Sequence, residues 1–244
     1  DDVALFARDK LVESGVTVHF YEDESRPTTL KQRYRAGQKT LLRVSHLRQH
    51  AINKETMNRI LKGFIEIISK IDLLIFADFN YGCLPQPLVD SIMDECLKRG
   101  IMMVADSQSS SQAGDVSRFK DMALVTPTER EARFSVQDYE SGLVVLAEKL
   151  RQKSRVQNVV ITLAEEGVLI HAETSKKDKW LTDRLPSFNT TPKDVSGAGD
   201  SLLTCASMAL AVGANVWQSS YLGSLAAASQ GGTPVNCEMC KHSE

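Results

Sequence analysis

Short apolar runs that are typical of buried strands alternate with longer segments of helical periodicity along most of this chain. The runs are rich in Val, Ile, Leu and Met and occupy residues 72–78, 100–106, 122–127 and 158–163. The helical segments occupy residues 54–70, 85–99 and about 141–153. Asn53 precedes the first of them, and the second has Pro85 at its first position and Gly100 after its end, which are signals for helix ends. Because a helix between two strands lets the second strand run parallel to the first, this alternation predicts a mainly parallel sheet with helices on both faces. The expected fold class is therefore an α/β/α sandwich.

The composition narrows the kinds of partner that the chain would bind. Its 244 residues, 42% of them hydrophobic, suffice for one sizeable core without metals or disulfides. A formal charge of −2 with dispersed Lys and Arg offers no basic surface for nucleic acid or an anionic membrane. No apolar run is long enough to span a membrane, and the beginning, DDVALFARDK, lacks the features of a signal peptide. We expect a cytoplasmic protein that acts on a small molecule.

The five cysteines are odd in number, and three of them lie in apolar or helical segments: Cys83, Cys96 and Cys205. Such positions favour reduced thiols over a disulfide framework. The segment CEMCKH places Cys237, Cys240 and His242 at the spacing of metal ligands. A tetrahedral zinc site needs a fourth ligand, and the sequence offers no second cysteine pair. We interpret this segment as an exposed tail rather than a metal or redox site.

Residues 194–213, DVSGAGDSLLTCASMALAVG, combine a glycine-rich turn with an apolar helix. The turn would present the amides of three small residues, namely Gly197, Ala198 and Gly199. A helix over 198–212, closed by Gly213, would add unsatisfied N–H groups and the positive end of its dipole, which favour an anion. Asp200 could take a proton from a substrate hydroxyl, while Asp194 opens the turn. The pattern predicts a phosphoryl-transfer site, and the alternative is a helix-capping loop.

The order DVSGAGD before a small-residue helix resembles the signature DTxGAGD of the ribokinase-like (PfkB) sugar and nucleoside kinases, with Val195 in place of the threonine. In that family the final aspartate is the catalytic base and the Gly-Ala-Gly amides form an anion hole. The resemblance therefore assigns the base to Asp200, the anion hole to residues 197–199 and a cofactor-binding role to Asp194. It also implies ATP, Mg²⁺ and one kinase domain over residues 1–244, a ribokinase-like three-layer sandwich with a small antiparallel β lid.

Residues 16–46 would form that lid, because GVTVHFYE, TTLKQRYR and TLLRVSH alternate apolar and polar side chains as antiparallel strands do. The last two are joined at Ala36-Gly37-Gln38, which predicts a hairpin. In the family the lid covers the sugar and often dimerises, so the resemblance suggests a homodimer. This stretch also resembles the heptose-7-phosphate kinases, which makes three cations candidates for binding a sugar phosphate: Lys31, Arg33 and Arg43. Solvated sheet residues are the alternative.

Two further segments resemble parts of the same kinase site. ADFNYGCL, residues 77–84, follows a strand and resembles the family's SDYxKGxL, which places Asp78 and Asn80 with the substrate at the carboxyl edge of the sheet. Asp78 could equally be a turn former. TPTEREA, residues 126–132, resembles the family's PNxxE, whose glutamate helps to order magnesium. Glu131 matches that glutamate and Thr128 replaces the asparagine. A capped helix N-terminus is the alternative here.

VITLAEEGVLIH, residues 160–171, contains two β-rich runs around a tight turn and resembles the family's nucleotide-binding element TLGxxG. Thr162 and Gly167 match the element, whereas Ala164 replaces its first glycine. If that position requires a positive φ, alanine would be strained there. The resemblance therefore predicts a nucleotide contact at this turn and a local departure from the family within it.

The beginning, DDVALFARDKLVESGV, resembles a part of these kinases that normally follows a couple of βα units. The chain therefore resembles the later part of a complete kinase, and we expect it to leave an apolar sheet edge open.

The first hypothesis is an ATP-dependent kinase of a sugar or sugar phosphate similar to heptose 7-phosphate. The second is an inactive or truncated homologue that serves as a nucleotide-binding or interaction module, motivated by Val195, Thr128 and Ala164. A Rossmann oxidoreductase is disfavoured, because no GxGxxG follows the first strand.

Overall fold

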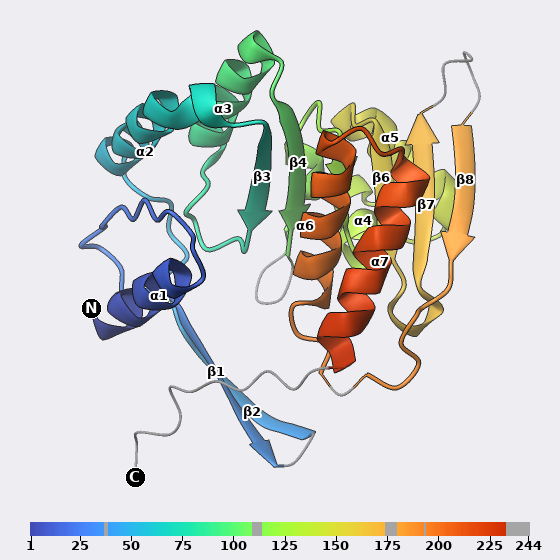
Figure 1. Cartoon of the computed structure of the whole chain (residues 1–244), viewed down its shortest axis with the longest axis horizontal. Coiled ribbons are helices and arrows are strands. Elements are labelled where there is room, and N and C mark those ends of the chain that lie inside the picture. Colours follow the sequence, from blue (N-terminus) through green and yellow to red (C-terminus); the bar gives the residue numbers. More distant parts are fainter. Residues whose placement is uncertain (37–38, 109–113, 174–179, 193, 233–244) are drawn as a thin grey trace. The chain divides into compact units, whose positions relative to one another are not determined.

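The computed structural model describes residues 1–36, 39–108, 114–173, 180–192 and 194–232, and it forms two compact units (Figure 1). We call them the hairpin unit and the sheet unit after the strands that each contains. The hairpin unit comprises Asp1–Ile71 and Asp78–Ile101, and the sheet unit comprises Asp72–Ala77 and the chain from Met102 onward. Each unit is described by itself.

Two strands and several helices make up the hairpin unit. Its elements are α1 (Asp2–Glu13), β1 (Leu30–Ala36), β2 (Lys39–His46), α2 (Lys54–Ile67), the 3-10 turn η1 (Ile68–Lys70) and α3 (Gln86–Arg99). Strands β1 and β2 are antiparallel, with Leu30 opposite His46 and a register shift between Tyr34 and Arg35. The predicted hairpin is confirmed, although Gly37 and Gln38 of its turn lie outside the described residues.

The predicted strand at GVTVHFYE is wrong, because residues 16–23 form no regular structure. Alternation of apolar and polar side chains favours a strand only where a neighbouring strand can pair with it. Among the described residues, β1 and β2 form a two-stranded sheet of their own and leave this segment no partner. Val16 and Phe20 are consequently about half exposed, at 46% and 51%.

The helices of the hairpin unit begin and end where local signals predict. Asn53 caps α2 by accepting a hydrogen bond from the Thr56 amide at 2.8 Å. Pro85 precedes α3, and Gly100 ends it in the left-handed conformation, with φ of +66°. The predicted helices at 54–70 and 85–99 are confirmed, with η1 continuing the first as a tighter turn.

The sheet unit is built around one mixed sheet of six strands. In sheet order they are β3 (Leu73–Asp78), β4 (Met102–Ser107), β5 (Leu124–Val125), β6 (Asn158–Thr162), β7 (Val168–Glu173) and β8 (Trp180–Leu185). Strands β4, β5 and β6 are parallel neighbours, whereas β6, β7 and β8 are antiparallel neighbours. The remaining elements are η2 (Val116–Arg118), α4 (Glu129–Val136), α5 (Leu143–Ser154), η3 (Ala164–Glu166), α6 (Ala198–Ala211) and α7 (Val216–Gly232).

Helices cover both faces of this sheet, with α6 and α7 on one face and α4 and α5 on the other (Figure 1). Val160 and Ile170 of the strands pack with Leu203 and Ala206 of α6 in one continuous apolar cluster. Ile161, which alternates with Val160 along β6, is fully buried as well. Apolar side chains thus fill both sides of the sheet, which confirms the predicted three-layer α/β/α sandwich.

The outermost strand of the sheet, β3, pairs with β4 on one side, and no described strand pairs with its other side. Its sequence is LLIFAD, and Leu73, Leu74 and Ile75 are only partly buried. An apolar edge strand of this kind can accept a further strand. Among the described residues, β3 is therefore an unpaired apolar edge strand, as the sequence predicts.

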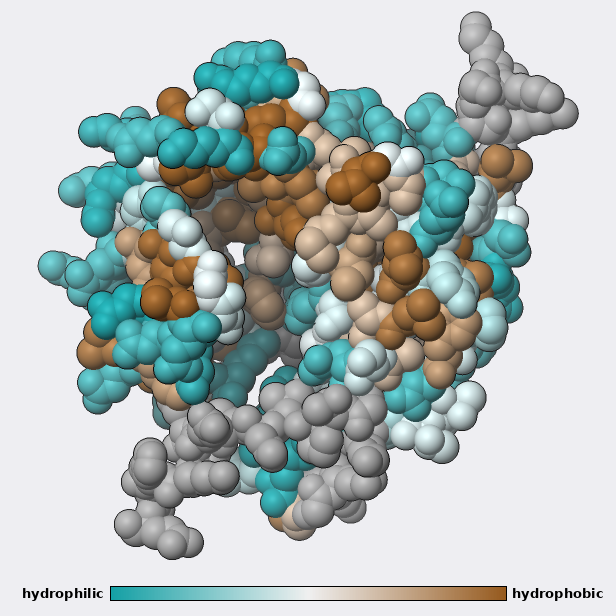
Figure 2. All heavy atoms as spheres, in the orientation of Figure 1, coloured by the Kyte–Doolittle hydropathy of each residue, from teal (hydrophilic) through white to brown (hydrophobic). Residues whose placement is uncertain are grey.

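Close packing explains the small residues of α6 and α7. A methyl group on Gly223 would lie 2.7 Å from the Leu202 carbonyl oxygen and 3.1 Å from the Ala206 Cβ. On its solvent side the same helix pair exposes large apolar side chains (Figure 2), namely Met208, Val212, Leu222 and Leu225. Within the described residues, no helix combines the length and apolar character that a membrane span requires.

The described cysteines Cys83, Cys96 and Cys205 are free thiols, as the sequence predicts. Burial raises the pKa of the Cys96 thiol to about 11, which keeps it protonated and unreactive at neutral pH. The segment 237–242, with its two cysteines and histidine, lies outside the described residues.

Candidate active site

The glycine-rich turn leads directly into α6. Gly197 is the residue before the helix and has φ of +80°, a left-handed conformation that favours glycine. The Ala198 amide donates to the Val195 carbonyl at 3.2 Å within the turn. A methyl group on Gly199 would meet no atom within 4 Å, so this residue adjoins open space. The amides of a first helical turn lack intrahelical partners, and here they lie beside that space.

Asp194 and the end of α7 hold the turn in place. An Asp194 carboxylate oxygen accepts from the Ser196 amide at 3.0 Å, and the Asp194 amide donates to the Gly231 carbonyl at 3.3 Å. The Gln230 side chain donates to the Ser196 carbonyl at 3.4 Å. Asp194 therefore has a structural part as an Asx turn, in addition to the cofactor role that the sequence predicts.

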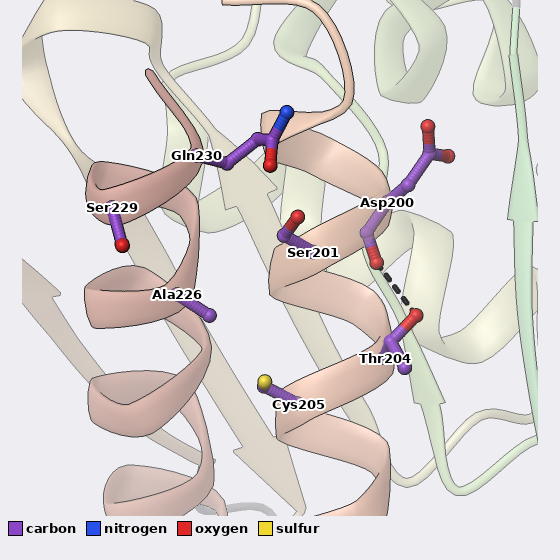
Figure 3. Close-up of a pocket in the computed structure, with 7 residues that line it drawn as sticks. All are labelled: Asp200, Ser201, Thr204, Cys205, Ala226, Ser229 and Gln230. Atoms are coloured by element: carbon purple, nitrogen blue, oxygen red, sulfur yellow. Dashed lines mark hydrogen bonds between the residues drawn. The ribbon is translucent and has the colours of Figure 1, made fainter. Parts of the chain in front are cut away.

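Asp200 lies in the first turn of α6 with an exposed side chain (Figure 3). Its Oδ1 accepts a hydrogen bond from the Gln108 amide group at 2.9 Å. The Thr204 hydroxyl donates to the Asp200 backbone carbonyl at 2.8 Å and not to the carboxylate. A groove of about 460 Å³ is lined by residues of α6 and α7, namely Asp200, Ser201, Thr204, Cys205, Ala226, Ser229 and Gln230. Because the Asp200 side chain is exposed, a small hydroxyl compound can reach its carboxylate from solvent.

The predicted nucleotide turn connects β6 and β7. The Thr162 amide donates to the Pro127 carbonyl at 2.9 Å, which ties the turn to the segment before α4. Ala164 has φ of +52°, so the strain expected from the missing glycine is present. Gly167 has φ of +92°, and a methyl group there would lie 2.0 Å from the Leu185 carbonyl oxygen. Glycine is therefore required at position 167, because the end of β8 and the chain after it lie too close for a Cβ atom.

Thr128 and Glu131 form a reciprocal cap at the start of α4. The Thr128 amide and hydroxyl both donate to Glu131 Oε2 at 2.8 Å, and the Glu131 amide donates to the Thr128 hydroxyl at 3.3 Å. The helix-cap alternative thus describes the local structure correctly. Among the described residues, no three His, Cys, Asp or Glu side chains gather to hold a metal ion. A dedicated all-protein metal cage is therefore absent from this part of the chain.

Asp78 is the last residue of β3, and Asn80 lies in the loop between β3 and α3; both belong to the hairpin unit. Asp78 is buried, and its Oδ1 accepts from the Asn80 amide at 2.9 Å, which confirms the turn-forming alternative for this aspartate. Gly82 has φ of +77°, and a methyl group there would lie 2.1 Å from the His50 carbonyl oxygen. The Gly82 carbonyl accepts from the Ile52 amide at 3.0 Å. We call residues 78–82 the acceptor loop, after the substrate contact that the sequence resemblance predicts for Asp78 and Asn80.

Arg26 fastens the acceptor loop, a contribution that sequence analysis missed. Its guanidinium donates to Asp23 Oδ2 at 2.9 Å, to the Tyr81 carbonyl at 2.8 Å and to the His50 carbonyl. The Arg26 and Asp23 side chains are only 10% and 6% exposed. Hydrogen bonds from the Ser25 hydroxyl and amide, together with the Arg26 charge, lower the pKa of Asp23. Nothing in the local sequence distinguishes this arginine from a solvated one.

The structure brings the three predicted cations onto one face of the hairpin. Arg33 pairs directly with Arg43, and Lys31 lies two residues from Arg33 on the same side of β1. Both arginines are exposed, whereas Lys31 is partly buried with its Nζ 4.9 Å from the centre of the Tyr81 ring. Tyr81 stands where the pattern SDYxKGxL has lysine. Lys31 is thus held against an aromatic ring beside the acceptor loop.

Comparison with known protein families shows which family the chain belongs to. The sequence model of the pfkB family of carbohydrate kinases matches residues 1–231. The chain belongs to the pfkB family of carbohydrate kinases. Family membership confirms the resemblance carried by DVSGAGD.

The chain is similar to proteins named Bifunctional protein HldE. The protein from Sulfurimonas denitrificans is 28% identical over 211 residues, which cover 84% of this chain and 41% of that protein. The protein from Helicobacter hepaticus is 26% identical over 249 residues, which cover 100% of this chain and 49% of that protein. The pfkB-family chain therefore spans about half the length, or less, of these relatives.

Solved structures share the fold at low sequence identity. Ribokinase from Giardia lamblia superposes with a TM-score of 0.74 at 15% identity and covers 96% of this chain and 76% of its own. Phosphofructokinase-2 from Escherichia coli, in complex with substrates and products, gives a TM-score of 0.69 at 18% identity, with coverages of 90% and 69%. These similarities confirm the ribokinase-like fold of this pfkB-family chain.

Proposed function

We propose that this chain carries out ATP-dependent phosphoryl transfer to a hydroxyl of a sugar or sugar phosphate, with Asp200 as the catalytic base. The observation that carries the proposal is the exposed Asp200 carboxylate in the first turn of α6, beside the open space at Gly199. A base and a positively polarised helix start lie together there, as phosphoryl transfer requires. Membership of a carbohydrate-kinase family supports the same reaction.

In this mechanism Asp200 receives the proton of the acceptor hydroxyl as that oxygen attacks phosphorus. The amides of residues 197–199 and the dipole of α6 stabilise the negative charge that spreads over the transferring phosphoryl group. Because the Ala198 amide is engaged within the turn, Gly197 and Gly199 would supply the principal contacts. Placement of the acceptor beside the base supplies much of the remaining rate.

Thr162, Gly167 and Asp194 would hold the nucleotide, and Glu131 would position its magnesium. Mg²⁺ usually keeps several waters and takes one or two carboxylates along with phosphate oxygens, so a single buried glutamate fits such a site. Magnesium, when bound with ATP, would neutralise phosphate charge. Thr128 supports this role because its amide and hydroxyl orient the Glu131 carboxylate.

For the acceptor we propose a sugar phosphate similar to D-glycero-D-manno-heptose 7-phosphate. The hairpin's resemblance to heptose-7-phosphate kinases and the shared cationic face of Lys31, Arg33 and Arg43 support it. A phosphate group suits such a face, since each cation can donate to its oxygens. Asp78 and Asn80 would contact the sugar hydroxyls.

We further propose that two copies associate through the hairpin. Tyr34, Leu41 and Leu42 are 52%, 65% and 55% exposed, which is unusual for three large apolar side chains on two short strands. Burying them against a second hairpin would remove this apolar surface from water. Light scattering should give twice the monomer mass, and a monomer mass at micromolar concentration would reject this assembly.

The decisive experiment measures transfer from Mg-ATP to a panel of sugars and sugar phosphates, with Asp200→Asn as the test variant. Loss of a general base lowers turnover by about 10²- to 10⁴-fold, while the increase of Tm on adding Mg-ATP should remain. Asp183→Asn, an exposed aspartate on β8, is the matched control and should keep full activity. Equal turnover of Asp200→Asn and parent would remove Asp200 from the base role.

The second candidate is a nucleotide-binding module without transferase activity. The strained Ala164 in the nucleotide turn and the exposed Val195, at 67%, in place of the signature threonine favour it. Such a module would show an increase of Tm with Mg-ATP but no product with any acceptor. Product that depends on the acceptor would exclude it.

A further inference from the structure

We propose that Gln108 is a positioning residue for the catalytic base, an inference that rests on the proposed function of Asp200. Gln108 follows the end of β4 and is 92 residues away from Asp200 in the sequence. Its amide nitrogen nevertheless donates to Asp200 Oδ1 at 2.9 Å. Within the described residues, Gln108 is the hydrogen-bond donor to this carboxylate.

The fold holds Gln108 at this place. The two residues before it, Asp106 and Ser107, are 8% and 1% exposed, so the end of β4 is anchored in the sheet unit. Gln108 itself is partly buried. In open α/β sheets the carboxyl ends of the strands are where ligands bind, which is where this side chain starts. Gln108 therefore reaches the carboxylate from a position directly after a buried strand end.

The hydrogen bond distinguishes the two oxygens of an otherwise symmetric base. With Oδ1 held by the Gln108 amide, Oδ2 is the oxygen that receives the acceptor proton. Gln108 thereby orients the base without touching the reacting atoms.

Two substitutions test this role, because they leave Asp200 in place and change only its neighbour. Gln108→Ala removes the donor and should lower kcat about tenfold with an unchanged KM for ATP, since one such hydrogen bond is worth about a tenfold effect. Gln108→Glu places a like charge beside the carboxylate and should move the acid limb of the pH–rate profile to higher pH. A purely structural role would not move that limb.

Gln86→Ala is the matched control, because Gln86 also donates to an aspartate, Asp90, at 2.7 Å on the exposed surface of α3. It should leave kcat and the pH profile unchanged. NMR titration of the Asp200 carboxyl carbon gives a second readout that requires no turnover. Its midpoint should rise in Gln108→Glu, because that substitution adds a like charge beside the carboxylate.

Unchanged kinetics and an unchanged titration midpoint in both Gln108 variants would overturn the proposal. Faster turnover of Gln108→Ala would also overturn it, because Gln108 would then occupy the place of the acceptor hydroxyl and block the base. If Asp200→Asn loses activity while the Gln108 variants behave as the parent, only the role of Gln108 fails. If Asp200→Asn keeps full activity, the proposed function itself fails.

Discussion

The acceptor loop of the hairpin unit and the glycine-rich turn of the sheet unit are held in very different ways. Arg26 joins the acceptor loop to two other segments through a guanidinium that is only 10% exposed. The glycine-rich turn has one Asx hydrogen bond of 3.0 Å, and its contacts with the end of α7 are longer, at 3.3 Å from the Asp194 amide and 3.4 Å from Gln230. It also adjoins open space at Gly199. The acceptor loop is held in place by contacts within the protein, whereas the glycine-rich turn leaves space for a ligand.

This difference matches what each region would bind under the proposed function. A sugar is recognised by hydrogen bonds of defined direction, and a preformed loop avoids the entropy cost of ordering it on binding. A phosphoryl group carries its own charge and can draw amides toward it. The contrast teaches that a buried charge can rigidify one region of a chain while another region stays open. Two pairs of variants test it, and a third prediction concerns a separate buried network.

The largest effect is expected for Gly82→Ala. A Cβ at this position would lie 2.1 Å from the His50 carbonyl oxygen, and the residue has φ of +77°. Left-handed backbone and overpacking together should lower the free energy of unfolding by roughly 2–5 kcal/mol. Urea denaturation followed by circular dichroism measures it. A loss below about 1 kcal/mol would show that the acceptor loop yields easily, against the effect expected for overpacking.

Gly199→Ala is the counterpart in the glycine-rich turn and the control for that prediction. No atom lies within 4 Å of the added Cβ, and alanine favours a helix over glycine. The free energy of unfolding should stay constant or rise by up to about 1 kcal/mol. Turnover should fall, because the methyl group would enter the space that the proposed function assigns to the phosphoryl group. If Gly82→Ala and Gly199→Ala lowered the free energy of unfolding equally, the two regions would not differ in the way described.

An intermediate effect is expected for Arg26→Gln. The substitution leaves the Asp23 carboxylate without its cation and weakens the contacts to the Tyr81 and His50 carbonyls. Hydrogen exchange of the Ile52 amide, which donates to Gly82, should accelerate about 10- to 100-fold as the acceptor loop opens locally. Exchange in α6 should not change.

Arg155→Gln is the matched control for that variant. Arg155 pairs with Asp121 on the surface, with the two side chains 62% and 32% exposed, and exposed pairs contribute little. Its Tm and exchange pattern should resemble the parent's. Unchanged exchange at Ile52 in Arg26→Gln would mean that Gly82 and its neighbours hold the acceptor loop without the arginine.

The smallest effect concerns pH and a buried network that belongs to neither region. His171, fully buried, contacts Glu148 at 2.8 Å and Thr182 at 2.7 Å through its two ring nitrogens. Burial lowers the pKa of His171 below its ordinary 6.5. Burial alone would raise the pKa of Glu148, but hydrogen bonds from Arg151, His171 and Gln152 outweigh it and bring that pKa to about 2.

Both groups bind protons more readily in the unfolded chain, so this network loses stability as pH falls. Tm should decline below pH 6.5 as unfolded His171 gains a proton, and again between pH 4.5 and about 2 as Glu148 does. Differential scanning calorimetry from pH 8 to pH 3 measures this. Glu148→Gln should flatten the lower step. A constant Tm between pH 7.5 and 5 would contradict the assignment to His171.

Local sequence predicted those elements whose signals are complete within a few residues. The apolar run at 158–163 became β6, Asn53 capped α2, and Gly100 ended α3. Even the strain at Ala164 followed from a single missing glycine. The alternation at 15–22 failed, because pairing of a strand depends on a partner that periodicity cannot supply.

By itself, then, the sequence determined most strands and helices of the sheet unit, several helix ends and the glycine-rich turn that presents Asp200. These features depend on propensity, periodicity and backbone freedom, all of which act over short distances along the chain. Only the tertiary structure decided that Gln108 meets Asp200 and that Arg26 fastens the acceptor loop. An isolated polar side chain gives no local sign of its partner, because the contact exists only once the fold brings together segments distant in sequence.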